Sequence, residues 1–297
     1  MEIKHRELKH EYMLINEKSI EEPDITIECE FGDEIIEGRL LTLGHHVVEY
    51  MNKPSCCKQL FELLEKNNWR LPENIKQDKY TIGINNPDLD TVLTIFLLEN
   101  LDWVKNVMED ITGRIYLRDF VTFADNMDNN GVHTIRYCAS YDISAGMVVA
   151  YINWLLNQDS SIDYKEQIKN GLNFIYKMFN DNEVVRQYLL HEKNRIDEIM
   201  KNHISDNRYG RLFKSAVFCN AEYLGFDFIV NFNPIYKSVT LSFKDSGKRF
   251  NAKKIMQDIF GEKAGGHLGI AGTPKNEKFD VKDAFLVFVY VTSLYCC

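Results

Sequence analysis

The stretch K-A-G-G-H-L-G-I-A-G-T-P-K, residues 263–275, holds four glycines within eight residues and a single histidine among them. Glycine tolerates left-handed backbone conformations, so successive N–H groups of such a loop can point at one anionic oxygen. Residues 251–260, which precede it, have the apolar spacing of a helix. The stretch therefore predicts a helix followed by a phosphate-binding loop, with His267 over a phosphate or nucleotide. The alternative is a flexible surface loop whose histidine binds nothing.

The composition is typical of a soluble globular protein with room for two domains. The chain has 297 residues, of which 45% are hydrophobic and 27% are charged. Its formal net charge of −9 repels long nucleic acid, so we expect no duplex partner. A small anionic substrate that is handled through metal ions fits this charge better.

Cysteine usage and the lack of long apolar segments predict a cytoplasmic protein. The seven cysteines include two adjacent pairs and no C-x-x-C spacing, which favours reduced thiols over disulfides or a zinc site. The charged start M-E-I-K-H-R-E lacks the apolar run of a secretory signal. The longest apolar stretch, residues 284–291, is too short to span a bilayer, so no membrane interaction is expected.

Two histidines follow a predicted strand in the first quarter of the chain. A β-like run over residues 38–43 ends at Gly44, His45 and His46. Beyond the end of a strand, side chains no longer alternate strictly between two faces, so both histidines can reach one site. An amphipathic helix with Ser55 as its N-cap is predicted to follow.

Candidate metal ligands also follow the next predicted strand. Residues 80–84 read as a buried strand that runs into N-N-P-D-L-D-T before a helix over residues 92–98. Asp88 and Asp90 are two apart on an extended segment, so we expect their carboxylates on one side, at the carboxyl end of a strand. Neighbouring carboxylates repel one another and favour a hard cation between them. The alternative is that Asp90 caps the helix and Asp88 is solvated.

A third carboxylate is expected from residues 116–130, Y-L-R-D-F-V-T-F-A-D-N-M-D-N-N. An apolar strand or helix edge delivers Asp125 and Asp128 into a polar segment rich in turn residues. Their spacing does not match a twelve-residue calcium loop, which excludes an EF-hand. We predict Asp125, in preference to Asp128, as a ligand of a metal cluster. The alternative is a helix that ends in a polar turn.

The rest of the chain predicts a helical connector and a second, smaller domain. Residues 142–156 and most of residues 164–203 have helical periodicity, and the end of the latter segment is highly charged. From about residue 208 onward the sequence is richer in β-like runs and more basic. We therefore assign residues 1–205 to one domain, including the connector, and residues 206–297 to another.

Two motifs resemble those of the DHH phosphoesterase superfamily. G-G-H-L-G-I-A-G, residues 265–272, is similar to the glycine-rich signature of the DHHA1 domain, the C-terminal substrate-binding domain of that superfamily. N-P-D-L-D, residues 86–90, is similar to the first DHH motif, which binds manganese or a similar divalent ion in the family. The G-H-H at residues 44–46 lacks the aspartate of the family's Asp-His-His triplet and precedes the N-P-D-L-D motif instead of following it. Ile84 stands where the family usually has a histidine.

The resemblance implies an α/β protein in which a parallel-sheet metal-binding domain is joined by a long helical connector to a smaller mixed-sheet α/β domain. It implies an enzyme, a divalent-metal-dependent phosphodiesterase or exonuclease that acts on a small nucleotide, either a cyclic dinucleotide or a short oligonucleotide. Two Mn²⁺ or Mg²⁺ ions would be held by Asp88, Asp90, Asp125, His45 and His46, and all of these except Asp125 would also be catalytic. The substrate would be bound by Gly265, Gly266, His267 and Gly269. The departures from the family pattern give the alternative of a catalytically inactive nucleotide-binding or interaction protein, and a homodimer is left open.

Overall fold

The structure is a computed structural model of residues 1–297. It describes the whole chain apart from residues 1–2, 4–6, 16–21, 32–33, 46–52, 131–134, 136–138, 140–141, 156, 159–161, 217–220, 222–224, 245–247, 275–276 and 297.

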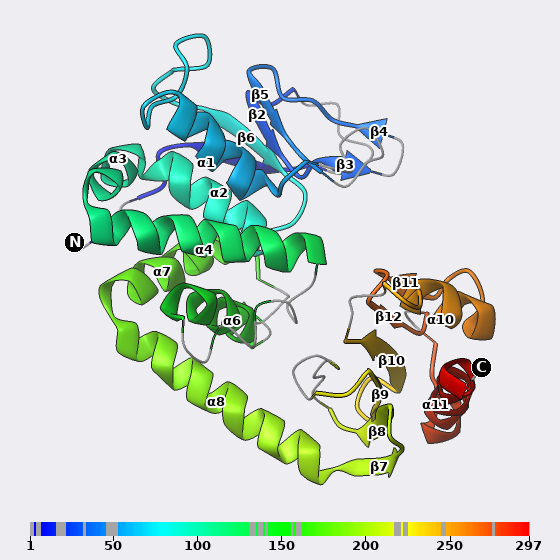
Figure 1. Ribbon diagram of the computed structural model, residues 1–297. Helices are drawn as coiled ribbons and strands as arrows, with labels where there is room; N and C mark the ends of the chain where they lie inside the picture. Colours follow the sequence, from blue (N-terminus) through cyan, green and yellow to red (C-terminus); the bar gives the residue numbers. More distant parts are fainter. Residues whose placement is uncertain are drawn as a thin grey trace. The chain divides into compact units, whose positions relative to one another are not determined.

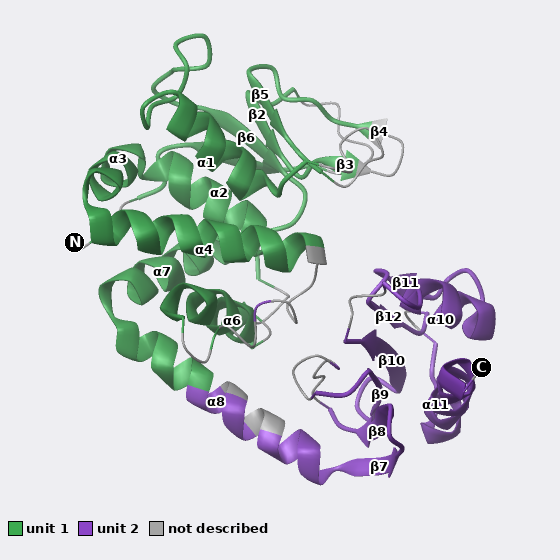
Figure 2. Ribbon diagram, in the orientation of Figure 1, with its two compact units in different colours: residues 1–129, 138–189 green, residues 130–137, 190–297 purple. Residues whose placement is uncertain are grey.

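The chain divides into two compact units (Figure 2). Unit 1 contains residues 1–129 and 138–189, and unit 2 contains residues 130–137 and 190–297. The division falls within helix α8 (Asn182–Lys201), upstream of the domain boundary that the sequence predicts at residue 205. Each unit has a main sheet of its own.

A four-stranded parallel sheet forms the centre of unit 1, in the order β1-β6-β2-β5 (Figure 1). Ile27 pairs with both Ile84 and Leu43, so β6, β2 and β5 end next to one another. Open α/β sheets bind their ligands at this end of the strands. The strands of the sheet are β1 (Glu11–Leu14), β2 (Ile25–Ile27), β5 (Leu41–Leu43) and β6 (Thr81–Ile84), and a separate two-stranded ribbon is formed by β3 (Glu30–Phe31) and β4 (Glu34–Ile35).

Helix α2 (Leu89–Glu99) is the central helix of unit 1, and all of its residues are buried. It contacts α1, α3, α6 and α7, which explains why its sequence is mostly apolar without a solvated face. Helix α1 also contacts β5, and Gln59 Nε2 donates to Gly44 O at 2.9 Å, so the start of α1 is held at the carboxyl end of β5. The other helices of the unit are α1 (Cys56–Lys66), α3 (Leu101–Glu109), α4 (Ile111–Asn130), α6 (Ile143–Leu155) and α7 (Tyr164–Asn180).

A six-stranded mixed sheet forms unit 2, in the order β11-β12-β10-β9-β8-β7. Strands β8 and β9 pair in parallel, and the other pairings are antiparallel. Helices α10 (Ala252–Phe260) and α11 (Val281–Cys296) bury apolar residues with the sheet in one core. The strands are β7 (His203–Asp206), β8 (Gly210–Lys214), β9 (Phe228–Asn233), β10 (Ser238–Phe243), β11 (Gly265–Gly266) and β12 (Ile270–Gly272).

The predicted α/β class, with a parallel sheet in one part of the chain and a mixed sheet in another, is confirmed. Residues 116–130 are part of the continuous helix α4, which runs on through the polar D-N-M-D-N-N sequence to Asn130. The glycine-rich stretch is the β11–β12 hairpin at one side of the mixed sheet, so it is more ordered than a surface loop. None of the described helices combines the length and the apolarity that crossing a bilayer requires.

Candidate metal centre

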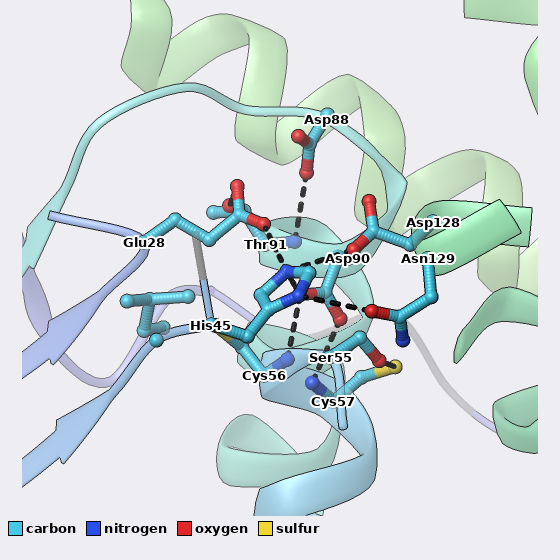
Figure 3. A network of polar contacts seen from close by, with 12 residues as sticks. Glu28, His45, Ser55, Cys56, Cys57, Asp88, Asp90, Thr91, Asp128 and Asn129 are labelled. Carbon is cyan, nitrogen blue, oxygen red and sulfur yellow. Dashed lines mark hydrogen bonds and ion pairs between the residues drawn. The ribbon is translucent and has the colours of Figure 1, made fainter. Parts of the chain in front are cut away.

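Four acidic and imidazole side chains converge at the carboxyl end of the parallel sheet (Figure 3). They are Glu28, His45, Asp90 and Asp128, and one ligand atom from each lies within 4.8 Å of the others. The first three are 4%, 6% and 1% exposed, and Asp128 is partly buried. Carboxylates buried this deeply need cations or hydrogen-bond donors to compensate their charge.

Glu28 follows the last residue of β2 and has a strained backbone. Its φ of 54° lies in the left-handed region, and its carbonyl accepts a hydrogen bond from Glu30 N at 2.9 Å. Such a conformation persists where the surrounding structure imposes it, often at functional sites. The tight turn places the Glu28 carboxylate between two side chains. Its Oε2 lies 3.4 Å from the Thr91 hydroxyl, and its Oε1 lies 3.4 Å from His45 Nε2.

His45, two residues beyond β5, is the hub of the cluster. Its Nε2 lies 2.8 Å from Asp128 Oδ2 and 4.0 Å from Asp90 Oδ2. On the other side of the ring, Nδ1 lies 3.3 Å from Asn129 Oδ1. Burial lowers the pKa of His45, but contacts with Asp128 and Glu28 outweigh it and raise the pKa to about 11. As an imidazolium, His45 offsets part of the negative charge of the three carboxylates.

Asp90, in the first turn of α2, caps a different helix. Its Oδ2 accepts the N–H of Cys56 at 2.7 Å and its Oδ1 accepts the N–H of Cys57 at 2.8 Å, both at the amino end of α1. Ser55, the predicted N-cap of α1, makes no side-chain capping bond. Burial and then the charges of Glu28 and Asp128 raise the pKa of Asp90 to about 7. The amino end of α1 therefore fixes the orientation of a carboxylate that belongs to the cluster.

The last turns of α4 supply Asp125, Asp128 and Asn129. Asp125 Oδ1 accepts from Ser55 N at 2.7 Å and from Asn129 Nδ2 at 2.8 Å, so the amino end of α1 also occupies this carboxylate. Asp128, three residues further on, is the one that reaches His45. The sequence analysis preferred Asp125 to Asp128 as a metal ligand. In the structure Asp128 belongs to the cluster and Asp125 does not.

Asp88 lies beside the cluster without belonging to it. It is the N-cap of α2, and its Oδ1 accepts the N–H of Thr91 at 3.0 Å. Burial and then the charges of Glu28 and Asp90 raise the pKa of Asp88 well above its usual range. The helix begins at Leu89, so Asp88 and Asp90 do not lie on one side of an extended segment as predicted. The alternative interpretation made Asp90 the cap of this helix, but the cap is Asp88.

Of the predicted ligands, His45 and Asp90 meet in the cluster, and His46 lies outside the described residues. Glu28 escaped sequence reasoning, although it carries the same signal as Asp88: a carboxylate shortly after an apolar strand, here I-T-I. A Cβ on Gly44 would collide with the carboxylate of Glu30.

In the glycine-rich hairpin of unit 2, Gly266 is the glycine that permits close backbone packing. Gly266 has a φ of 138°, and a Cβ there would collide with the carbonyl of Ile270. The N–H of His267 donates to Ile270 O at 2.7 Å, so the turn itself uses this donor. The His267 side chain is exposed, while Gly269 is buried against β10 and its carbonyl accepts from Phe243 N at 2.8 Å. Within this hairpin the exposed imidazole is the group that a ligand could reach.

The donor set of the cluster fits a hard divalent cation. Three carboxylates and one imidazole are ligands that Mg²⁺ or Mn²⁺ accepts. An octahedral shell at about 2.0–2.1 Å places ligand atoms about 2.9 Å apart when adjacent and about 4.1 Å apart when opposite. His45 Nε2 lies 2.8, 3.4 and 4.0 Å from the three carboxylate oxygens, which matches this span. Glu28, His45, Asp90 and Asp128 could therefore hold a divalent ion.

Comparison with known proteins finds similarity in structure alone. No protein-family model and no curated protein matches the chain. The solved structures that resemble it include a pGpG-specific phosphodiesterase, PggH from Vibrio cholerae, with a TM-score of 0.41 and 12% identity over 88% of this chain and 80% of that one. An exopolyphosphatase-related protein from Bacteroides fragilis has a TM-score of 0.32 and 12% identity over 88% of this chain and 65% of that one. An uncharacterised protein from Helicobacter pylori G27 has a TM-score of 0.22 and 15% identity over 86% of this chain and 75% of that one.

Proposed function

We propose that this protein hydrolyses a phosphodiester bond in a small nucleotide, a cyclic dinucleotide or a short oligonucleotide, with divalent ions bound at Glu28, His45, Asp90 and Asp128. The observation that supports this most is the convergence of two buried carboxylates, one partly buried carboxylate and one imidazole at the carboxyl end of a parallel sheet. The two sequence motifs support the substrate class. The net charge of −9 supports a small substrate over a long nucleic acid.

The charge of the cluster supports a bound cation. With His45 protonated, the three carboxyl groups still outnumber one imidazolium, and two of them, those of Glu28 and Asp90, are buried. Glu28, His45, Asp90 and Asp128 would hold this cation, which would supply a water molecule of lowered pKa and positive charge for a phosphoryl group.

The residues around the cluster hold its ligands in place. The N–H groups of Cys56 and Cys57 fix both oxygens of Asp90. Asn129 contacts Nδ1 of His45, which leaves Nε2 directed at the carboxylates. Partners of this kind orient metal ligands and tune their affinity. For the second of two Mn²⁺ or Mg²⁺ ions we assign Asp88, because Thr91 links it to the cluster: the Thr91 N–H donates to Asp88 Oδ1 at 3.0 Å and the Thr91 hydroxyl donates to Glu28 Oε2 at 3.4 Å.

In unit 2 we assign substrate binding to the β11–β12 hairpin, at Gly265, Gly266, His267 and Gly269. The exposed His267 side chain supports this assignment, since its imidazole can donate to a non-bridging phosphate oxygen. The glycines contribute by letting the backbone turn tightly around it.

The test is hydrolysis by the purified chain. Linear dinucleotides, cyclic dinucleotides and short RNA are incubated with Mn²⁺ or Mg²⁺ and, separately, with EDTA. We expect cleavage of at least one substrate only when an ion is present, together with an ion-dependent rise in Tm. Asp90→Asn should abolish both, whereas Asp197→Asn, at an exposed aspartate of α8, should change neither. If every substrate stays intact and neither ion nor EDTA alters the Tm, the proposal is wrong.

A further inference from the structure

A pocket of about 240 Å³ adjoins Asp88 in unit 1. It lies between the loop that precedes α2 and the segment that runs from the end of α6 into α7. Apolar walls come from Pro87, Leu155 and Ile162. Its polar and aromatic lining consists of Asn86, Asp88, Trp154, Gln158, Gln167 and Asn170.

Neutral amides dominate the polar lining. Among the described residues that form the pocket there is no lysine or arginine, so it lacks the cations with which proteins usually bind phosphate. Gln158 Nε2 donates to Trp154 O at 3.1 Å and Gln167 Nε2 donates to Ile162 O at 2.7 Å, which orients both side chains. The side-chain amide of Asn170, by contrast, has no hydrogen-bond partner in the part of the chain that the structure describes. Its amide can both donate to and accept from a ligand.

The aromatic side of the pocket is Trp154, which packs against other rings. The Trp154 ring stacks on Phe174, with centroids 4.9 Å apart and planes 8° apart, and it also contacts Tyr151 at 5.3 Å. An aromatic side chain beside several amides, two of them oriented by hydrogen bonds, suits a planar heteroaromatic ring that carries hydrogen-bonding groups along its edge. Enzymes that hold a nucleobase outside a duplex read it in this way, by stacking and by hydrogen bonds to its edge.

The size of the pocket limits what it can hold. Pockets for drug-sized ligands and cofactors measure about 300–1,000 Å³. A volume of about 240 Å³ accommodates one ring system and leaves its sugar and phosphate outside.

Thr91 connects the pocket to the candidate metal centre. Its N–H donates to Asp88 Oδ1 at 3.0 Å, and its hydroxyl donates to Glu28 Oε2 at 3.4 Å (Figure 3). Asp88 therefore borders the pocket on one side and the cluster on the other. A nucleotide whose base occupied the pocket would carry its phosphate outside it, next to Asp88.

We propose that this pocket binds the nucleobase of the substrate and thereby positions the attached phosphoester at the metal centre. The proposal rests on the proposed function for the view that the substrate is a nucleotide. Binding of the base itself, however, requires neither an ion nor turnover, so it can be measured independently.

The first measurement is the binding of adenosine, guanosine, cytidine and uridine to the chain in EDTA, by saturation-transfer NMR. We expect at least one nucleoside to bind. Asn170→Ala and Gln158→Ala should each weaken it about two- to tenfold, the loss that one neutral hydrogen bond produces. Asn157→Ala is the matched control, because Asn157 is an exposed amide next to Gln158 that does not line the pocket.

The second measurement compares two dinucleotides that differ only in whether one nucleoside carries its base, with Mn²⁺ present. Asn170→Ala should raise KM about two- to tenfold for the base-bearing substrate and leave KM unchanged for the abasic one. A merely structural role for Asn170 would affect both substrates equally.

The outcomes separate the two proposals. Nucleoside binding that the pocket variants weaken, without hydrolysis of any substrate, supports the pocket and overturns the proposed function. Absence of nucleoside binding overturns the pocket whether or not hydrolysis occurs. Nucleoside binding that both pocket variants leave unchanged overturns it as well, because the base is then bound elsewhere.

Discussion

Asp90 and Asp125 allow helix capping to be separated from ion binding. Both accept N–H groups at the amino end of α1, Asp125 from Ser55 at 2.7 Å and Asp90 from Cys56 and Cys57 at 2.7 and 2.8 Å. Only Asp90 belongs to the cluster. Replacing either residue by alanine therefore removes a cap, but only Asp90→Ala removes a candidate ligand.

The two effects differ in size. Loss of a helix cap costs about 0.5–2 kcal/mol of stability, which corresponds to a drop in Tm of about 1–8 °C in EDTA for a domain of this size. An ion at 100 times its Kd stabilises the folded state by about 2.7 kcal/mol, equivalent to a rise of about 5–11 °C. Both variants should be destabilised in EDTA, and the Mn²⁺-induced rise should persist in Asp125→Ala and disappear in Asp90→Ala. Asn129 remains placed in Asp125→Ala because its Nδ2 also donates to the backbone carbonyl of residue 125 at 3.1 Å.

The assay is thermal unfolding of the wild type and both variants across a Mn²⁺ titration. A full Mn²⁺ response in Asp90→Ala would refute the assignment of the cluster as the ion site. Loss of the response in both variants would mean that it depends on the amino end of α1 and not on a ligand.

Three further predictions concern the surroundings of the site. Asn129→Ala should weaken Mn²⁺ binding roughly 10- to 100-fold in a calorimetric titration, because His45 loses the partner of its Nδ1. An unchanged affinity would show that Asn129 does not help to orient His45. His267→Ala should lower turnover roughly ten- to a hundredfold with an unchanged Tm, since an exposed side chain contributes little to folding but can donate a hydrogen bond to a charged phosphate. Full activity of this variant at low substrate concentration would show that His267 does not bind the substrate. The Mn²⁺-induced rise in Tm should be larger at pH 8 than at pH 6. The pKa of Asp90 is raised to about 7 in the folded state, so the ion-free protein loses stability as the pH rises from about 4 to 7 and Asp90 ionises. The pKa of His45 is raised to about 11, so the stability that protonated His45 contributes is lost as the pH rises from about 6.5 toward 11. Ion binding needs an ionised Asp90 and a neutral His45, so a bound ion stabilises the protein more at the higher pH. An equal rise in Tm at pH 6 and pH 8 would contradict this.

The helix α4 illustrates how far a sequence pattern reaches. Leu117, Phe120, Val121 and Ala124 are buried at helical spacing, although the sequence alone leaves both a strand and a helix open for this segment. The polar D-N-M-D-N-N sequence that follows resembles a helix end when read alone. It stays helical because Asp125 and Asp128 continue the buried face at the point where it meets α1 and His45. At this candidate site polar contacts thus replace apolar packing, and local propensity cannot anticipate that substitution.

What the sequence by itself determines is where the strands end and which side chains stand there. Apolar runs before His45 and Asp88 predict strands, and parallel strands gather their carboxyl ends at one place, so a polar site is predictable. Only the tertiary structure decides which carboxylates enter the cluster. That choice depends on where the amino end of α1 lies, because its free N–H groups take both oxygens of Asp90 and one of Asp125 across 33 to 70 residues of chain. Helix N–H groups attract whichever carboxylates packing brings near them, and packing is set by contacts too distant in the chain for any local pattern to record.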